Sequence, residues 1–298
     1  MGTKLEGIIQ KYKYAKLIKK EFGFNYINIF MYHFFKKNKS LTVIFKDQSF
    51  KMEFFKIASL SKLLNEGWQI RSVNNDYIKM FNVEDRSMIT CRMQIPNDIL
   101  QLVELWIAKI YGSEFEGKNV IDVGASKGDS SIFFCKKGAK RVIAFEPDQS
   151  SYVMALDNIR ESGVVEKVSI INKAISGKTG KTELIVYDHN PHANSTDRAN
   201  MANLKDTKHT EIAETISLKE AIDAFNGENV DFLKMDCEGC EYGTLKSLDL
   251  SYYNKIREIR MEYHNGVQDL PNILNNNGFN CSITGDKSKM GYIIAKKS

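Results

Sequence analysis

The sequence predicts an α/β fold with a mostly parallel sheet, preceded by a smaller α+β region. Short apolar runs alternate with segments of helical periodicity from about residue 119 to residue 278, which is typical of a parallel sheet covered by helices. The first apolar run leads directly into a turn that contains two glycines. Two alternating runs on either side of Gly285-Asp286 predict an antiparallel hairpin at the C-terminal end.

The N-terminal region contains patterns of both helix and strand. Residues 4–20 place apolar side chains at helical spacing with lysines on the other faces, which predicts a basic helix. The aromatic side chains of residues 22–35 are expected in a core or a dimer contact. Residues 41–55 alternate weakly and predict a hairpin, and residues 88–93 predict a further strand.

A change of pattern near Pro96 predicts a domain boundary. Pro96-Asn97 is a typical helix start, and the following apolar stripe ends at Gly112. The stripe consists of Ile99, Val103, Trp106 and Ile110. We therefore expect an accessory domain over residues 1–96 and a second domain over residues 97–298, as a chain of 298 residues suggests roughly two domains.

In the second domain, the strands are predicted from short apolar runs and the helices from a helical period that often ends at a glycine. The predicted strands are residues 119–123, 141–145, 168–172, 231–235, 256–262, 279–283 and 291–295. The predicted helices cover residues 130–137 and 150–162, a segment that begins with the capping box Ser217–Glu220, a segment with Tyr242, Leu245 and Leu248, and a segment that ends at Gly278. The polar stretch 188–200 predicts a long loop, and such loops often cover or bind a ligand.

Composition excludes several classes of protein. Hydrophobic residues are 43% and charged residues 27% of the chain, which is typical of a globular protein rather than a disordered one. The N-terminus lacks a secretory signal, and its longest apolar stretch is shorter than the ~18 residues of a membrane span. The five cysteines are an odd number and widely scattered, which does not indicate a disulfide framework and favours a cytoplasmic location.

The most specific motif is the strand and turn over residues 120–128. Gly124 can adopt a positive φ and lets a ligand approach the backbone. Gly128 begins a helix whose free N–H groups form an anion site. Glu146, 18 residues after Gly128, ends the second strand, where its carboxylate can accept both hydroxyls of a ribose.

Two cofactor classes compete for this motif. A dinucleotide requires Gly-x-Gly-x-x-Gly, but Ser126 and Asp129 occupy the second and third glycine positions. Asp129 would also place a negative charge beside the pyrophosphate. S-adenosylmethionine has no phosphate and needs a ribose carboxylate, an anion site and an acid near its ammonium group, which Asp122 and residues 124–128 suit better.

Together these residues resemble the FkbM-type family of S-adenosylmethionine-dependent methyltransferases. The resemblance covers about residues 119–298, and the Asp-x-Glu-Gly-x-Glu segment at 236–241 is its most specific part. The matching segments are NVIDVGASKGDSSIFFCKKGAKRVIAFEPD at 119–148, NKAIS at 172–176, DFLKMDCEGCEYGTL at 231–245 and EIRMEYH at 258–264. The resemblance implies the class I methyltransferase fold, a Rossmann-like sheet of seven strands with an antiparallel C-terminal hairpin.

The resemblance also implies a cofactor site and a transfer site. S-adenosyl-L-methionine is expected across the tips of the first, second and fourth strands. Its predicted binding residues are Asp122, Gly124, Ala125, Ser126, Gly128, Glu146, Pro147, Ala174 and Asp236. The predicted catalytic residues are Asp236, Glu238, Glu262 and His264, with Glu241 close by. Either Asp236 or His264 would be the general base, with Asp236 preferred.

Two other interpretations concern the same segment. Cys237 and Cys240 form a Cys-x-x-Cys motif, which could be a redox pair or half of a zinc site. No second such motif exists in the chain, so both are expected to be buried packing residues. Asp236, Glu262 and His264 have the chemistry to hold a divalent metal, but no metal is predicted.

The expected reaction is O-methylation of a hydroxyl on a sugar, a glycan or a small metabolite. Residues 1–100 carry 17 Lys and Arg against 9 Asp and Glu, so a nucleic-acid methyltransferase that uses this basic region is the main alternative, although nucleic acid is not the favoured partner. An NAD-dependent oxidoreductase and a non-catalytic binding protein are further alternatives. Asn194 and Ser195 are candidates for substrate contact, and a homodimer is compatible with the sequence.

Overall fold

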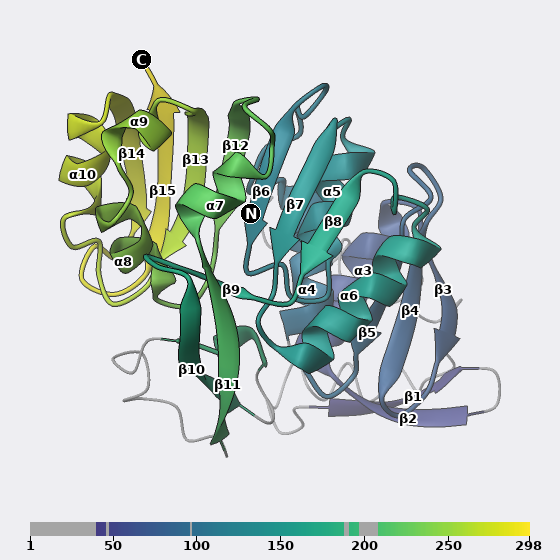
Figure 1. The fold of residues 1–298 in the computed structure, drawn as a ribbon. Helices are drawn as coiled ribbons and strands as arrows, with labels where there is room; N and C mark the ends of the chain where they lie inside the picture. Colours follow the sequence, from purple (N-terminus) through teal and green to yellow (C-terminus); the bar gives the residue numbers. More distant parts are fainter. Residues whose placement is uncertain (1–39, 46–47, 96, 188–190, 197–207) are drawn as a thin grey trace, which may run out of the picture. The chain divides into compact units, whose positions relative to one another are not determined.

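The computed structural model describes residues 40–45, 48–95, 97–187, 191–196 and 208–298. The chain divides into two compact units, Met1–Ile110 and Tyr111–Ser298 (Figure 1). The predictions for residues 4–20 and 22–35 lie outside the described residues. None of the helices in the described ranges combines the length and the apolar character that a membrane crossing requires.

The N-terminal unit contains two small antiparallel sheets and short helices. The predicted hairpin and the predicted strand at 88–93 are both present, whereas a helix and two strands between them were not predicted from the sequence. The elements are β1 (Ser40–Phe45), β2 (Gln48–Glu53), α3 (Phe54–Asn65), β3 (Trp68–Val73), β4 (Tyr77–Asn82) and β5 (Met88–Arg92). β1 pairs with β2, and β4 pairs with both β3 and β5.

The helix predicted to run to Gly112 is α-helical only in its first part. α4 (Asn97–Leu102) continues as a π-helical segment, η1 (Val103–Ala108), and Lys109 then adopts a left-handed conformation with φ +51°. Trp106, in the π-helical segment, packs edge to face on Trp68 and donates from its indole Nε1 to Asp85 at 2.7 Å. These two contacts with residues distant in the sequence fix the position of the indole.

The C-terminal unit is built on a seven-stranded sheet (Figure 1). Its order is β14-β15-β13-β12-β6-β7-β8, and β15 runs opposite to the other six strands. This confirms the predicted class I methyltransferase fold with its antiparallel C-terminal hairpin. The strands are β6 (Asn119–Val123), β7 (Arg141–Phe145), β8 (Val168–Ile171), β12 (Val230–Met235), β13 (Ile256–Tyr263), β14 (Phe279–Gly285) and β15 (Gly291–Lys297).

The central strands are buried because helices connect them across the faces of the sheet. All five residues of β6 are buried, as expected for a parallel strand covered on both sides. The predicted capping box is present, with the Ser217 hydroxyl accepting from the Glu220 N–H and the Glu220 carboxylate accepting from the Ser217 N–H. The helices are α5 (Asp129–Lys136), α6 (Gln149–Glu161), α7 (Leu218–Asp223), α8 (Cys240–Lys246), α9 (Leu250–Tyr253) and α10 (Leu270–Asn276).

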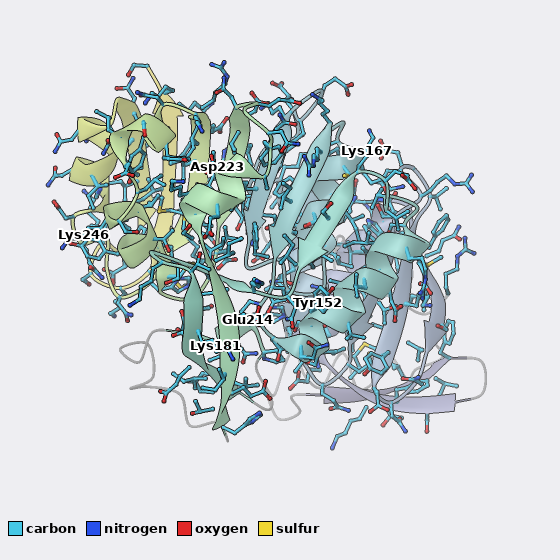
Figure 2. All side chains as sticks on the ribbon, viewed as in Figure 1. Tyr152, Lys167, Lys181, Glu214, Asp223 and Lys246 are labelled. Carbon is cyan, nitrogen blue, oxygen red and sulfur yellow. A yellow bond between two sulfur atoms is a disulfide. The ribbon has the colours of Figure 1, made fainter. Side chains whose placement is uncertain are left out.

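A second sheet of three strands was not predicted from the sequence. β10 (Gly180–Tyr187) pairs with β11 (Lys208–Ser217), which also pairs in parallel with β9 (Ala174–Ser176). Lys181 and Glu214 are opposite each other in this pairing and both are exposed (Figure 2). The predicted loop over 188–200 lies between the two long strands, and its described part includes the short 3₁₀ helix η2 (Pro191–Ala193).

Candidate active site

The turn after β6 lies at the carboxyl edge of the seven-stranded sheet. Gly124, Ser126 and Gly128 all adopt positive φ, at +74°, +47° and +81°. The N–H groups of Gly124 and Ala125 both donate to the carbonyl of Phe145 at 3.0 Å, which ties the turn to the end of β7. The chain therefore forms a tight turn over the tips of two neighbouring strands, as the sequence motif predicted.

The turn also touches the loop that follows β12. The strand order places β6 between β12 and β7, so the chain switches direction across the sheet at this point, where α/β proteins bind ligands. The Asp236 N–H donates to the Val123 carbonyl at 3.1 Å. A Cβ atom at Gly124 would overlap the backbone oxygen of Asp236, so glycine is required here by close packing as well as by its φ.

Asp122 supports the turn from inside the sheet. Its side chain is fully buried, and one carboxylate oxygen accepts from the hydroxyls of Ser130 and Ser131 at 2.6 Å each. The other oxygen lies 3.2 Å from the ammonium group of Lys234, which also donates to the carbonyl of Gly124 at 2.6 Å. Asp122 thus holds the start of α5 and the base of the turn together.

Glu146 lies at the tip of β7, beside the same turn. The N–H of Ser126 donates to one of its oxygens and the N–H of Asp148 to the other, both at 2.8 Å. Burial raises the pKa of Glu146 to about 7, although both backbone hydrogen bonds oppose the rise. The Asn172 side chain donates to the carbonyls of Glu146 and Pro147, which fixes the backbone around this carboxylate.

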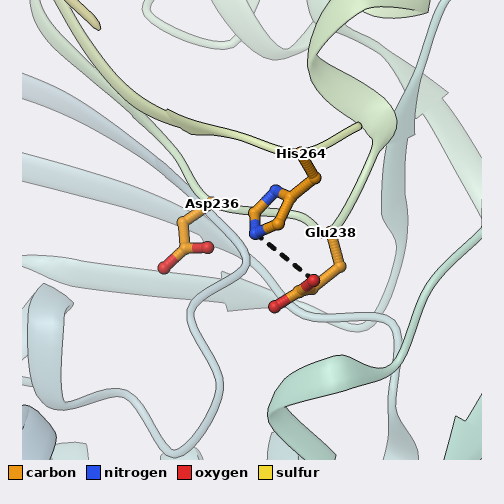
Figure 3. Close-up of side chains that lie close together, drawn as sticks. All are labelled: Asp236, Glu238 and His264. Carbon is orange, nitrogen blue, oxygen red and sulfur yellow. Dashed lines mark ion pairs between the residues drawn. The ribbon is translucent and has the colours of Figure 1, made fainter. Parts of the chain in front are cut away.

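A second group of side chains lies at the ends of β12 and β13. Figure 3 shows the ring of His264 between the side chains of Asp236 and Glu238. The Nε2 atom of His264 is 3.3 Å from the Glu238 carboxylate, and its Nδ1 atom is 3.2 Å from the carboxylate of Glu241. Glu241 is buried and accepts from the N–H groups of Cys237 and Gly239. We refer to Asp236, Glu238, Glu241 and His264 as the acid–histidine cluster.

The carboxylates of this cluster control its protonation. The hydrogen bond to Glu241 and the charges of Glu238, Glu241 and Asp236 raise the pKa of His264 to about 10, against the opposing effect of burial. The imidazole is therefore an imidazolium at neutral pH. Burial and, to a smaller extent, the neighbouring acids Asp236, Glu241 and Glu262 raise the pKa of Glu238 to about 8, against the lowering effect of the His264 charge.

Three residues of the cluster have the chemistry of metal ligands. Asp236, Glu238 and His264 each offer one ligand atom, and these atoms lie within 4.8 Å of one another. The set differs from the one suggested by the sequence, because Glu238 stands in the place of Glu262.

The predicted loop reaches the same region. The Ser195 hydroxyl donates to the backbone oxygen of Glu238, and Ser195 also forms a backbone bridge with Ile185 of β10. The two candidates for substrate contact, Asn194 and Ser195, therefore lie beside the loop of the cluster. The Asn194 side chain accepts from the N–H of Tyr187 at 2.8 Å.

The prediction that Cys237 and Cys240 are buried packing residues was right that both pack against the core of the C-terminal unit, but wrong about their burial and their bonding. The two sulfur atoms form a disulfide, and both side chains are only half-buried. Glu238 and Gly239, with φ +55° and +113°, turn the chain between them and bring the two Cα atoms to 5.5 Å, which is within the range of a disulfide. The interpretation as a redox pair, considered from the sequence, fits this geometry.

The comparisons with known proteins identify the family. The model of the methyltransferase FkbM domain matches residues 122–281, more than half of the chain. The chain belongs to the FkbM methyltransferase family. This membership is what the sequence resemblance implied.

The relatives of this FkbM-family protein are distant. It is 38% identical over 78 residues to the ribosomal protein arginine N-methyltransferase rmt3 of Schizosaccharomyces pombe, which is 25% of this chain and 14% of the relative. Among solved structures, it is similar to methyltransferase FkbM from Methylobacillus flagellatus, at 16% identity and a TM-score of 0.43 over 64% of this chain and 47% of that one. TrmK of M. capricolum, solved with S-adenosyl-homocysteine, is 12% identical with a TM-score of 0.37 over 62% of this chain and 64% of TrmK.

The residues of this FkbM-family site fit the cofactor of the family. Each oxygen of Glu146 accepts one backbone N–H and keeps a further lone pair for a hydroxyl group. The acids of the acid–histidine cluster suit a ligand with an ammonium and a sulfonium charge.

Several residues of the site were not singled out from the sequence. Lys234 lies within a strand that reads as apolar, and Tyr111 precedes the first predicted strand. Tyr111 is buried, and its pKa is raised by that burial and by the charges of Asp236 and Glu262, so its hydroxyl is part of the same electrostatic environment. A lysine in a run of otherwise buried strand residues is the one signal that could have identified Lys234.

Proposed function

We propose that this FkbM-family enzyme transfers a methyl group from S-adenosylmethionine to a hydroxyl oxygen of a sugar, a glycan or another small metabolite. The observation that carries the proposal is the grouping of Asp236, Glu238 and His264 at the sheet edge, in contact with the turn after β6. A hydroxyl acceptor loses its proton as the new bond forms, and this grouping offers carboxylates to receive it.

The proposed cofactor site uses the residues around the turn. When bound, S-adenosylmethionine supplies a methyl group on a positively charged sulfur, which is already activated for transfer. We assign Glu146 to the ribose hydroxyls and Asp122 to the support of the turn through Ser130 and Ser131. The residues assigned to the methionine part are Gly124, Ala125, Ser126 and Gly128, and those assigned to the adenine side are Pro147 and Ala174.

Asp236 is the proposed general base. Its backbone is held against Val123, at the point where β6 and β12 diverge. His264 is a poor base at neutral pH because its pKa is raised to about 10 by the carboxylates around it. We therefore assign His264 a positioning role, in which its charge holds Glu238 and Glu241 in place. Glu262 contributes to the negative potential around the transfer site.

A second candidate is transfer to a nitrogen atom of a cationic acceptor such as an arginine side chain. The acid–histidine cluster favours it, because several carboxylates around one position attract a guanidinium group. The relative rmt3 is named as a ribosomal protein arginine N-methyltransferase. An acceptor panel with sugars, glycans, phenolic metabolites, arginine peptides and RNA separates the two candidates.

The proposal predicts the effect of one substitution. Asp236→Asn removes the proton acceptor and keeps the shape of the side chain, so turnover falls by about 10²–10⁴-fold. The dissociation constant of S-adenosylhomocysteine stays within about twofold of that of the unmodified enzyme, since the substitution acts on the transfer step and not on ligand binding. Asp249→Asn, the same change at an exposed position before α9, serves as the control and leaves both quantities unchanged.

Transfer of labelled methyl groups to the acceptor panel and calorimetric titration with S-adenosylhomocysteine measure the two effects. Methylation of hydroxyl acceptors that disappears in Asp236→Asn supports the proposal. Full turnover in Asp236→Asn contradicts the assignment of the base. Methylation of arginine peptides alone contradicts the O-methyltransferase function.

A further inference from the structure

We propose that Cys237 and Cys240 form a reversible thiol–disulfide site that controls how tightly this enzyme binds its cofactor. The ligand of the site is a dithiol reductant, which opens the disulfide and loosens the loop between β12 and α8. The inference rests on the proposed function for the role of Asp236 and Glu238, but the bond itself and its effect on cofactor affinity can be measured without an acceptor.

The position of the disulfide is the first argument. It encloses only Glu238 and Gly239, between the end of β12 and the first turn of α8. Both enclosed residues have positive φ, and Glu238 is not a glycine. A side-chain-bearing residue in this conformation persists only where its surroundings hold it. The disulfide joins the two residues that flank Glu238 and Gly239, and so supplies that constraint.

The second argument is that the bond is coupled to the rest of the acid–histidine cluster. The N–H of Cys237 donates to Glu241, and the Cys237 sulfur lies 3.4 Å from the same carboxylate oxygen. That oxygen is also the one within 3.2 Å of His264 Nδ1. Reduction puts a proton on the Cys237 sulfur, which then competes with His264 for this oxygen. Opening or closing the disulfide therefore changes the hydrogen bonding of Glu241 and His264, and through His264 that of Glu238.

The third argument is selectivity among the cysteines, all five of which lie in the described ranges. Cys91 and Cys135 are buried and take part in no disulfide, and burial raises the pKa of the Cys135 thiol to about 11. Cys281 is half-buried and free, and its thiol pKa is also raised by burial. Cys237 and Cys240 are half-buried and already joined. A dithiol would therefore act on one pair, and Cys281 offers a matched control.

The exchange balances with the dithiol as its reductant. A thiolate of the dithiol attacks one sulfur of the Cys237–Cys240 bond, which forms a mixed disulfide and releases the other cysteine as a thiolate that takes up a proton. The second thiol of the reductant then displaces the remaining cysteine and closes its own disulfide. Two electrons and two protons pass to the enzyme, and the reductant is oxidised.

The test maps the thiols and measures cofactor affinity in both states of the full chain. After treatment with oxidised glutathione, iodoacetamide labels Cys281 without labelling Cys237 or Cys240. After treatment with dithiothreitol, both cysteines are labelled, and mass spectrometry of the peptides assigns the sites. Titration with S-adenosylhomocysteine gives a dissociation constant at least threefold larger for the reduced chain.

Two variants make the result specific to the pair. The double variant Cys237→Ser with Cys240→Ser binds S-adenosylhomocysteine as the reduced chain does and no longer responds to dithiothreitol. Cys281→Ser responds to dithiothreitol as the unmodified chain does. Labelling of Cys237 and Cys240 after the oxidising treatment, or equal affinities in the two states, overturns the proposal. If no hydroxyl acceptor is methylated, the proposed function is wrong, but the labelling of the cysteines and the change in cofactor affinity are unaffected.

Discussion

Glu146 shows how one buried carboxyl group can act as a sensor for its ligand. Its side chain is 7% exposed, and its pKa is raised by burial to about 7. The folded state favours the neutral acid, so ionisation lowers stability as the pH rises from about 4.5 to about 7. Hydroxyl groups of a bound ribose would donate to the ionised form and return part of that stability.

The pH dependence of cofactor binding tests this role of Glu146. Because the ionised carboxylate is the better acceptor, the affinity for S-adenosylhomocysteine rises several-fold between pH 6 and pH 8. In Glu146→Gln the affinity is lower at pH 8, and the component of the pH dependence that belongs to this group is lost. Isothermal titration at half-unit steps of pH measures both effects.

A separate variant removes the contribution of Glu238, whose pKa is raised to about 8 and which titrates in an overlapping range. Glu238→Gln is expected to keep the rise in affinity around pH 7. An affinity that is independent of pH in the unmodified enzyme, or unchanged in Glu146→Gln, would show that Glu146 does not contact the ribose.

The two loops at the centre of the sheet act as one element. The turn after β6 and the loop after β12 share a backbone hydrogen bond from Asp236 to Val123, and Lys234 donates to the carbonyls of Val123 and Gly124. The Lys234 ammonium group therefore fixes both carbonyl groups, and it is itself paired with Asp122. A displacement of either loop moves both the cofactor turn and the proposed base.

Gly124→Ala tests this coupling. A Cβ at this position would overlap the Asp236 backbone, so we expect a loss of stability well above the ~1–2 kcal/mol of a left-handed alanine. Gly163→Ala is a matched control, because Gly163 has φ +67° and no atom within 4 Å of the added Cβ. Urea unfolding of both variants measures the difference.

The two alanine variants also differ in function. Gly124→Ala weakens the binding of S-adenosylhomocysteine at least tenfold where the protein still folds, and Gly163→Ala leaves it unchanged. Equal losses of stability in the two variants would contradict the close packing of the two loops.

At the scale of the whole molecule, the fold predicts a choice of cofactor. Thermal unfolding with S-adenosylmethionine, S-adenosylhomocysteine or NAD, all at one concentration of about 100 times a plausible dissociation constant, distinguishes the classes. A specific ligand adds about 2.7 kcal/mol of stability. This raises the melting temperature by roughly 5–10 °C for a domain of this size. We expect the shift with the two adenosyl compounds and none with NAD.

The control for this measurement is Glu146→Gln, which reduces the shift at a fixed ligand concentration. A shift with NAD alone would contradict the preference for S-adenosylmethionine that Ser126 and Asp129 indicated from the sequence. The N-terminal region has no role in this prediction, and the accessory domain expected over residues 1–96 stays a prediction.

The positions of the main strands could be predicted from the sequence because the central strands of the large sheet are short apolar runs and the C-terminal ones alternate between apolar and polar residues. The predicted strands at 119–123 and 141–145 coincide with β6 and β7. The strands β9, β10 and β11 were missed because they are short or have an exposed face, such as the residues at the start of β10. Such strands lack the apolar signal and are defined by their partners.

The sequence by itself determined the α/β class and the positions of Gly124, Glu146 and Asp236 at the ends of strands, because periodicity and turn glycines are local properties of the chain. The family came from the resemblance of its motifs, above all the Asp-x-Glu-Gly-x-Glu segment. Only the tertiary structure decided what surrounds those side chains. It brought Lys234 into contact with the turn carbonyl of Gly124 and Glu241 into contact with His264. It also brought Cys237 within bonding distance of Cys240. Protonation and disulfide formation depend on burial and on the distances between side chains, and these distances exist only after the strands are aligned.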